Sequence, residues 1–231
     1  MLVRKATTND IDNLTHYDRH ISPKELGNAD EACRVRGIDD LYEINMSKSI
    51  KDAHCIMSVN ETAYEVVKLL GHGKGGYSYL AQKDGKQYVL KQIHHEPCSY
   101  YTFGNKIEAE KNDYSRLEAT GIRIPKLFDI DIDNERILKE YVEGPTIYEL
   151  VKLDQMKEIY LEQVREMAGK AKACGLNIDY FPTNFVVQND LIYYIDYECN
   201  NYMDEWNFEN WGIKYWSKTQ EFMDYEKQHS K

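Results

Sequence analysis

The apolar residues of the chain follow two different patterns, and the change between them lies near Gly144-Pro145. Before this point, apolar residues come in short runs separated by glycine, proline or Asp-Gly turns, which is typical of β-strands. After it they recur at steps of three and four residues, which predicts an amphipathic helix. The apolar positions of that helix are Leu153, Met156, Tyr160, Val164, Met167 and Ala171. Gly175 supplies the left-handed conformation that ends it.

The first part of the chain predicts several strands with one helix between them. We expect strands over residues 66–70, 76–81, 88–93, 127–130 and 136–142, and a helix over residues 106–120. Asp84-Gly85 predicts a hairpin turn, because both residue types tolerate a positive φ. Gly121 and Pro125 follow the helix and end it.

The second part adds a short hairpin and a tail. Residues 185–187 and 191–195 are expected to pair as strands that turn at Asn189-Asp190. The tail over residues 204–231 is expected to be helical, and it carries all three tryptophans. The predicted fold class is therefore α+β, with a strand-rich half, a short hinge and a helix-rich half.

Residues 1–60 differ in character from the rest and are interpreted as an N-terminal extension, followed by lobes over residues 61–142 and 143–231. Val3-Arg4-Lys5-Ala6 and the polar Thr7-Thr8-Asn9-Asp10 indicate a strand and a helix start. Residues 1–35 thereby resemble the beginning of a GNAT-type acetyltransferase. The glycine-rich acetyl-CoA loop and the later strands of that family are missing, so an acetyltransferase ranks last among the functions considered.

Composition excludes some classes of function. With 231 residues and 42% hydrophobic residues the chain can form a substantial core. The formal net charge of −10 argues against a general nucleic-acid-binding protein, which needs surplus lysine and arginine. No run approaches the roughly 18 apolar residues of a membrane span, and the N-terminus has no apolar signal, so we expect a cytoplasmic protein without membrane contact. The five cysteines form no CxxC pair, so neither a zinc site nor a redox motif is indicated.

A glycine cluster lies between the first two expected strands. Gly71, Gly73 and Gly76 fit the spacing GxGxxG. A dinucleotide-binding site needs a helix directly after such glycines, whereas a strand pattern follows here. A glycine hairpin that lets backbone N–H groups approach phosphate oxygens is the functional alternative. A plain turn is equally compatible with the glycines alone.

Lys91 lies fifteen residues after Gly76 on the third expected strand. A lysine between apolar neighbours on such a strand can reach the α- and β-phosphates of a nucleotide. The alternative is an ordinary lysine that faces solvent. The functional interpretation also needs a helical glutamate beside the ammonium group, and Glu110 is preferred to Glu108, which lies on a different helical face.

The strongest signal is a pair of short segments around the second hairpin. Asp179 and Asn184 stand five residues apart directly before one strand, and Asp196 ends the partner strand. A hydroxyl nucleophile needs a carboxylate that accepts its proton, and Mg²⁺ prefers oxygen ligands. We therefore assign Asp179 as the base and Asn184 and Asp196 as metal ligands. Each residue could separately be a turn or strand-end residue.

Together these motifs resemble the protein-kinase-like superfamily. The resemblance covers residues 64–200 and is greatest to small atypical members, the RIO kinases and the KEOPS-complex kinase, and to aminoglycoside and choline kinases. It implies a bilobal fold with a strand-rich N-lobe and a short, mostly helical C-lobe, and it implies ATP and Mg²⁺ as cofactors. The segment from Lys139 to Gly144 is similar to the hinge that holds adenine, which gives Glu140 and Val142 a role in nucleotide binding.

Three departures from that superfamily affect the expected activity. Asn177 stands where a histidine is usual, so the support of the catalytic loop must differ. Tyr197-Glu198 replaces Phe-Gly after the metal aspartate, so Asp196 need not flip as a switch. No Ala-Pro-Glu follows and about 35 residues remain after Asp196, which leaves no room for an activation loop and a full peptide platform.

Two functions from different classes follow. The first is a kinase that moves the γ-phosphoryl group of ATP to a hydroxyl of a small molecule or a protein, including serine or threonine, or to water. The second is a nucleotide-binding pseudokinase that acts as a regulatory interaction module. Under the second, a protein partner would use the N-terminal extension or the tail residues Trp206, Phe208, Trp211 and Trp216. The simpler interpretation is that these aromatic residues close a small core.

Overall fold

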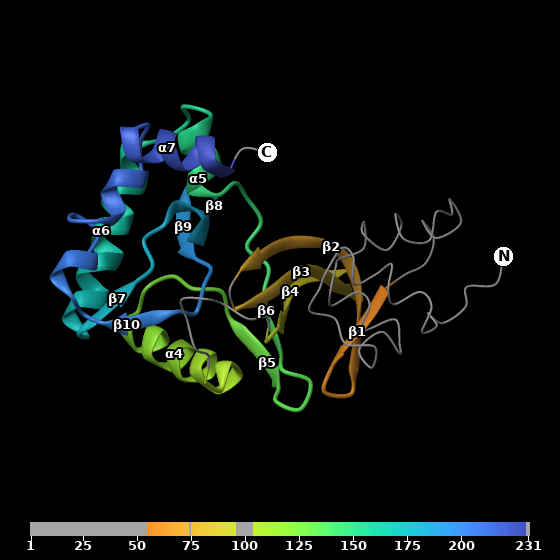
Figure 1. Cartoon of the computed structure of the whole chain (residues 1–231). Coiled ribbons are helices and arrows are strands. Elements are labelled where there is room, and N and C mark those ends of the chain that lie inside the picture. Colours follow the sequence, from red (N-terminus) through yellow and green to blue (C-terminus); the bar gives the residue numbers. More distant parts are fainter. Residues whose placement is uncertain (1–54, 74, 96–103, 230–231) are drawn as a thin grey trace. The chain divides into compact units, whose positions relative to one another are not determined.

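The computed structural model describes residues 55–73, 75–95 and 104–229 (Figure 1). Residues 1–54 of the predicted extension over residues 1–60, and with them its resemblance to an acetyltransferase, lie outside the described residues. The described chain mixes α-helices with antiparallel sheets, so the α+β class is confirmed. It divides into two compact units: the described residues up to Ile107 together with Leu127–Tyr141, and Glu108–Lys126 together with the residues from Val142 onward.

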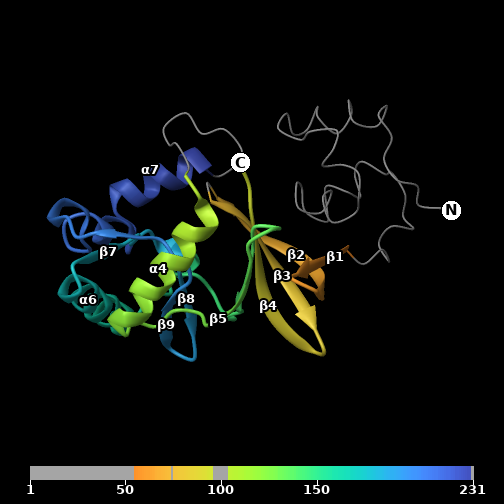
Figure 2. The same cartoon turned by 90° about the horizontal axis from the view of Figure 1, so that it is seen from below.

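The N-terminal unit is a six-stranded antiparallel sheet (Figure 1, Figure 2). Its strands lie in the order β1-β2-β3-β4-β6-β5. Their bounds are Cys55–Val59 for β1, Thr62–Gly73 for β2, Gly76–Lys83 for β3, Lys86–Ile93 for β4, Leu127–Asp131 for β5 and Arg136–Glu140 for β6. The sequence predicted β2 to β6 and missed β1, which pairs with β2 through five residues such as Met57, opposite Tyr64.

Turn-forming residues and the alternation of buried and exposed positions along the strands explain how this sheet forms. Asp84 and Gly85 join β3 to β4 with φ angles of 50° and 71°, as the Asp-Gly signal predicted. One face of the sheet forms the core of the unit. Its buried members are Cys55, Met57, Val59, Tyr64, Val66, Tyr77, Tyr79, Ala81, Leu90 and Leu138. Register shifts in β2, between Val66 and Lys68 and between Leu69 and Gly71, mark bulges or irregularities in the strand.

A buried polar network joins β1, β4 and β6. Arg136 is only 3% exposed. Its guanidinium group donates to Oε1 of Gln92 at 2.7 Å and to the carbonyl oxygen of Ser58 at 2.7 Å. Asp131 lies opposite Arg136 in the sheet register. Burial works to raise the pKa of the Asp131 carboxyl group, but hydrogen bonds from Asn134 and Asn60 and the charge of Arg136 outweigh it and lower that pKa.

We expect Arg136→Met to lower the free energy of unfolding by about 3 kcal/mol, because it leaves the buried Gln92 oxygen and the Asp131 carboxylate without their cationic partner. Chemical denaturation followed by circular dichroism measures this. Arg165→Met is the matched control, since the guanidinium group of Arg165 pairs with Glu209 at 2.8 Å on the surface and its loss should change stability by about 1 kcal/mol or less. Equal losses for both variants would contradict the expected role of the network.

The C-terminal unit combines helices with two short hairpin-like sheets. Its helices are α4 (Lys106–Thr120, with its first two residues in the N-terminal unit), α5 (Ile147–Lys152), α6 (Glu158–Ala173) and α7 (Gln220–His229). The strands are β7 (Leu176–Ile178), β8 (Phe185–Gln188), β9 (Leu191–Tyr194) and β10 (Cys199–Asn201), where β7 pairs with β10 and β8 with β9. No helix in the described part of the chain has the length and apolar character needed to cross a membrane.

The predicted long helix is two helices in the structure. Thr146 caps α5: its hydroxyl accepts a hydrogen bond from the Glu149 amide, and the Glu149 carboxylate accepts one from the Thr146 amide. The chain then turns at Asp154, which has a φ of 55°, and α6 begins only at Glu158. Leu153, placed on the apolar side by its spacing, lies in this turn and is 61% exposed. The prediction was therefore right for the positions from Tyr160 to Ala171 and wrong for the start of the helix.

The tail is less helical than predicted. Single turns of 3₁₀-helix at Asp204–Trp206 (η4) and Gly212–Tyr215 (η5) precede α7. Trp216 and Phe208 are each 1% exposed, and their ring centroids are 5.3 Å apart. These two residues belong to the core of the unit, as the simpler interpretation of the tail predicted. Trp206 instead remains 50% exposed.

Candidate active site

The glycine cluster forms the tip of the β2–β3 hairpin. Gly73 lies opposite Gly76 in the register of the two antiparallel strands. A strand and not a helix therefore follows the glycines, which excludes the dinucleotide-binding geometry. A Cβ atom at Gly76 would come within 2.3 Å of the carbonyl oxygen of Gln92 on β4. Gly76 is thus required by the close approach of two strands.

The other two glycines have no such packing reason. A Cβ atom at Gly71 or Gly73 would meet no atom of the described residues within 4 Å. The carbonyl oxygen of Gly73 lies 2.8 Å from Nε2 of His94, whose ring is 5.3 Å from that of Tyr77. His94 therefore holds the end of the glycine hairpin.

Lys91 lies in the interior of the six-stranded sheet. Strand β4 runs between β3 and β6, and Lys91 is paired with Ser78 on one side and Ile137 on the other. Its exposed fraction is 9%, so the alternative of a lysine facing bulk solvent is wrong. Burial of an ammonium group is expensive unless charged or polar groups surround it, which marks this position for a specific task.

The two glutamates considered as partners of Lys91 lie on α4 and differ in their surroundings. The carboxylate of Glu108 is 42% exposed and lies 3.8 Å from the ammonium group of Lys111. Glu110 is half-buried like Glu108, but its Oε2 atom is inaccessible to solvent. Burial therefore favours Glu110, as the sequence analysis did. Both belong to the C-terminal unit and Lys91 to the N-terminal unit, and the pairing of Lys91 with Glu110 stays a prediction.

The expected adenine-binding segment follows the end of β6. Glu140, the last residue of β6, is opposite Tyr88 in the register, and Val142 is buried. Gly144 comes next with a φ of 153°. A Cβ atom there would lie 1.9 Å from the carbonyl oxygen of Val187 on β8, so only glycine fits. The roles of Glu140 and Val142 in nucleotide binding remain predictions.

Asp179 and Asn184 bound one tight loop in the C-terminal unit. The loop leaves β7 at Ile178 and ends in a 3₁₀ turn, Pro182–Asn184 (η3). Oδ1 of Asp179 accepts a hydrogen bond of 3.0 Å from the amide of Phe181. The side-chain amide nitrogen of Asn184 reaches back toward the carbonyl oxygen of Asp179 at 3.4 Å. Because this nitrogen acts as a donor, Oδ1 of Asn184 is the atom that could bind a metal ion.

Asp196 follows directly on the β8–β9 hairpin. The amide of Ile195 donates to the carbonyl oxygen of Asn184 at 2.9 Å, which continues the hairpin by one pair beyond Phe185 and Tyr194. Oδ1 of Asp196 accepts a hydrogen bond of 2.8 Å from the amide of Tyr197. The structure thus brings Asn184 and Asp196 to the same end of one hairpin.

Tyr194 joins the loop of Asp179 to the segment that follows Asp196. This tyrosine is fully buried. Burial raises the pKa of its hydroxyl group well above the ordinary value, and the negative charges of Asp196 and Asp179 raise it further. The amide of Asp179 itself donates to the Tyr194 hydroxyl oxygen at 3.3 Å. The negative charges of both carboxylates therefore affect the hydroxyl group of the same tyrosine.

The donor set of this hairpin fits Mg²⁺. Asn184 and Asp196 supply an amide oxygen and a carboxylate oxygen, the hard ligands that Mg²⁺ prefers. No group of three or more His, Cys, Asp or Glu side chains forms a metal cage in the described part of the chain. Mg²⁺ commonly binds to one or two protein ligands, with water and phosphate oxygens completing its shell, so these two residues would suffice in the presence of a nucleotide.

Comparison with known proteins gives matches over part of the chain. No model of a known protein family matches it. A probable bifunctional tRNA threonylcarbamoyladenosine biosynthesis protein of Methanococcus vannielii is 30% identical over 91 residues, which are 39% of this chain and 16% of that protein. KEOPS complex subunit Bud32 of Pyrococcus abyssi is 29% identical over 93 residues, 38% of this chain and 42% of the subunit.

Each match covers less than half of the relative's length. The second relative is a subunit of the complex whose kinase the sequence motifs resemble. The comparisons therefore support a kinase-like relationship over part of the chain, and the activity and partners of the whole protein are matters for proposal.

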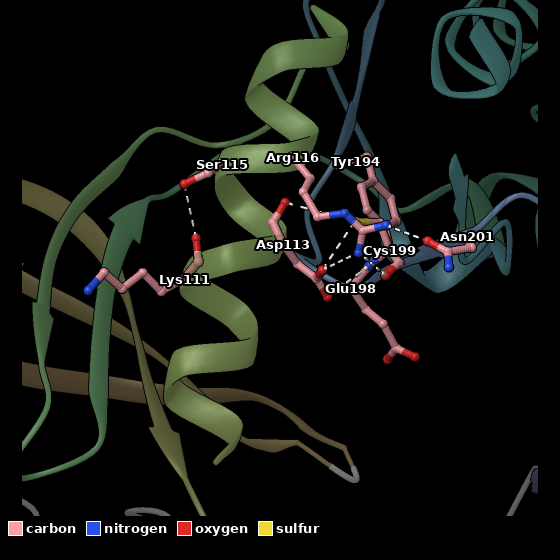
Figure 3. A network of polar contacts seen from close by, with 8 residues as sticks. All are labelled: Lys111, Asp113, Ser115, Arg116, Tyr194, Glu198, Cys199 and Asn201. Carbon is pink, nitrogen blue, oxygen red and sulfur yellow. Dashed lines mark hydrogen bonds and ion pairs between the residues drawn. The ribbon is translucent and has the colours of Figure 1, made fainter. Parts of the chain in front are cut away.

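A polar network on α4 holds the segment after Asp196 (Figure 3). The amide of Cys199 donates to Oδ2 of Asp113 at 3.3 Å, and its thiol group donates to Oδ1 of Asp113 at 3.3 Å. Burial, followed by the charge of Asp113, raises the pKa of this thiol to about 12, so the thiol keeps its proton. Arg116 donates to Asp113 at 2.9 Å and to Oδ1 of Asn201 at 3.0 Å. Helix α4 is thus fixed to β10 by side chains that sequence reasoning did not single out.

Proposed function

We propose that the protein is an ATP- and Mg²⁺-dependent phosphotransferase with a bilobal, protein-kinase-like fold, in which the two units are the N-lobe and the C-lobe. It transfers the γ-phosphoryl group to a hydroxyl group of a small molecule or a protein, or to water. The observation that carries the proposal is the arrangement of Asp179, Asn184 and Asp196 around one loop and hairpin. The kinase-like matches over part of the chain give it further support.

Each residue has a defined task in this proposal. Asp179 orients the acceptor hydroxyl group and takes its proton as the oxygen–phosphorus bond forms and the bond to the leaving ADP breaks. Asn184 and Asp196 hold Mg²⁺, which when bound neutralises charge on the phosphate oxygens. Lys91 binds α- and β-phosphate oxygens and Glu110 orients its ammonium group. Gly71, Gly73 and Gly76 cover the phosphates, and the backbone at Glu140 and Val142 binds adenine.

The acceptor is expected to be small or to be presented by another protein. After Asp196 only Tyr197 and Glu198 precede β10, which pairs directly with β7. A long activation segment that would shape a peptide groove is therefore not inserted at this point. This favours an acceptor that needs no extended docking groove over a peptide bound as in ordinary protein kinases.

Purified protein is expected to convert ATP to ADP in the presence of Mg²⁺, and Lys91→Met is expected to lower kcat/KM by about 100-fold, because phosphate charge loses its cationic partner. Release of ADP, with and without candidate hydroxyl acceptors, measures this. Lys86→Met is the matched control: it lies at the exposed start of the same strand and should retain wild-type turnover. Equal activity of the wild type and Lys91→Met would contradict the assignment of Lys91.

A melting experiment separates this proposal from the pseudokinase. A ligand that binds only the folded protein stabilises it, by about 2.7 kcal/mol at a concentration 100 times its Kd. Both functions therefore predict that ATP with Mg²⁺ raises the melting temperature. Stabilisation without ADP formation would favour the nucleotide-binding pseudokinase, whereas an unchanged melting temperature at millimolar ATP would contradict both.

A further inference from the structure

The residue that replaces the usual histidine does not join the two acidic segments. Asn177 is 4% exposed and stands two residues before Asp179. Its side-chain amide donates to the carbonyl oxygen of Met203 at 2.7 Å, so it is directed toward the tail. Its side-chain oxygen is buried and accepts no hydrogen bond within the described part of the chain. The loop of Asp179 must therefore be supported by another side chain.

Tyr194 provides that support from β9. Its hydroxyl oxygen accepts the hydrogen bond from the amide of Asp179 at 3.3 Å, and its hydroxyl proton is donated to the carbonyl oxygen of Glu198 at 2.7 Å. One buried hydroxyl group thus connects the backbone of the proposed base to the backbone two residues after the proposed metal ligand. The ring is held in place by Phe185, with ring centroids 5.3 Å apart.

The far end of the same segment is fixed independently. Asp113 accepts from the Cys199 amide at 3.3 Å, and Arg116 donates to the Cys199 carbonyl oxygen at 3.4 Å (Figure 3). The short stretch from Asp196 to Cys199 is therefore held at Glu198 by Tyr194 and at Cys199 by α4. Loss of the Tyr194 hydroxyl would free the connection to Asp179 while the attachment to α4 remains.

We propose that Tyr194 is a positioning residue of the phosphotransfer site, whose hydroxyl group sets the spacing between the base Asp179 and the metal ligand Asp196. This inference rests on the proposed function and names a residue that lies outside the motifs singled out in the sequence. The tyrosine touches no reacting atom. It acts through the two backbone segments that it joins, and small errors in their spacing slow a reaction that depends on alignment of acceptor, phosphate and metal.

Tyr194→Phe is the decisive variant, because it removes one oxygen atom and keeps the ring. We expect kcat for Mg²⁺-dependent ATP turnover to fall about tenfold, the effect of one lost hydrogen bond that orders the transition state. The Mg²⁺ concentration for half-maximal rate should rise, and KM for ATP should stay within about twofold of the wild type. Hydrogen exchange of the Asp179 amide should become faster, since its acceptor is gone.

Tyr197→Phe is the matched control. Tyr197 is 1% exposed and its hydroxyl group also donates to a backbone carbonyl oxygen, that of Pro125, at 2.7 Å. This bond does not reach the loop of Asp179. Both variants should lose similar stability, whereas Tyr197→Phe should keep the wild-type kcat, Mg²⁺ dependence and exchange rate of the Asp179 amide. A structural role alone would make the two variants behave alike, and that result would overturn the inference.

The outcomes also distinguish this inference from the proposed function. If the wild type binds ATP with Mg²⁺ but does not turn it over, the phosphotransferase fails, and the inference is judged by the Mg²⁺ concentration that gives half-maximal thermal stabilisation by ATP. An unchanged value in Tyr194→Phe would then overturn it.

If the wild type shows no response to nucleotide, both the proposed function and the inference about Tyr194 fail. If Tyr194→Phe does not fold, exchange of the wild-type Asp179 amide decides: rapid exchange like that of an exposed loop refutes the hydrogen bond.

Discussion

Asp179→Asn is expected to lower kcat for ATP turnover by about 10²- to 10⁴-fold while KM for ATP changes little, because the variant loses the proton acceptor and keeps the shape of the side chain. The amide oxygen of asparagine can still accept the hydrogen bond that Oδ1 of Asp179 receives from the Phe181 amide at 3.0 Å. The fold of the loop should therefore survive. Steady-state kinetics with ATP and Mg²⁺, together with nucleotide-induced thermal stabilisation, measures the separation of catalysis from binding.

The control for this variant lies on the adjacent hairpin. Asp190 pairs with the ammonium group of Lys157 at 2.6 Å, and its own side chain is 67% exposed. Its φ of 59° is one that asparagine adopts readily. Asp190→Asn should therefore keep the wild-type kcat. A kcat in Asp179→Asn that equals the Asp190→Asn value would remove Asp179 from the role of base.

The elements that could be predicted from the sequence are those fixed by residues within the element or directly beside it. The turn at Asp84-Gly85 and the hairpin turn at Asn189-Asp190 rest on residue types that accept a positive φ, and all four of these residues have one. Helix α4 was predicted from residue 106 to residue 120, and Gly121, with a φ of 69°, ends it. In each case the signal and the structure lie within a few residues of each other.

The parts that the sequence missed depend on distant partners. Strand β10 has only three residues, and Asn200 and Asn201 are poor strand formers. They are extended because β7 lies beside them, with Asn200 opposite Asn177. The start of α6 was missed because Leu153 and Met156 fit the helical spacing by chance, while the chain turns at Asp154. Short spacing rules cannot detect such a turn when its residues also suit the helix.

The residues of the candidate site divide in the same way, into those with a local signal in the sequence and those without one. Asp179, Asn184 and Asp196 could be singled out because one loop and one hairpin carry them, and the structure places all three in the C-terminal unit. Tyr194 was not found, because a tyrosine in a strand of alternating apolar residues usually serves packing. Its proposed role depends on a hydrogen bond from the Asp179 amide, fifteen residues earlier. Only the replacement of histidine by Asn177 indicated that an unusual support was needed.

Trp216 connects the C-terminal tail to the loop of Asp179. Its ring lies against Phe185 with centroids 5.0 Å apart and against Phe208 at 5.3 Å. Its indole N–H donates to the carbonyl oxygen of Tyr180 at 2.8 Å, directly after Asp179. Gly212 allows this approach, since a Cβ atom there would lie 2.5 Å from Cβ of Tyr180. The tail is therefore part of the core that supports the loop of Asp179.

Trp216→Ala is expected to lower the free energy of unfolding by about 3–5 kcal/mol, because it leaves a cavity of aromatic size and an unsatisfied carbonyl group at Tyr180. Trp216→Phe keeps most of the volume and should lose about 1–3 kcal/mol through the hydrogen bond alone. Trp206→Ala is the control: Trp206 is 50% exposed, and its removal should change stability by about 1 kcal/mol or less. Far-ultraviolet circular dichroism is the suitable measurement, because the substitutions themselves alter tryptophan fluorescence. A loss for Trp216→Ala no larger than that for Trp206→Ala would show that the tail is not part of this core.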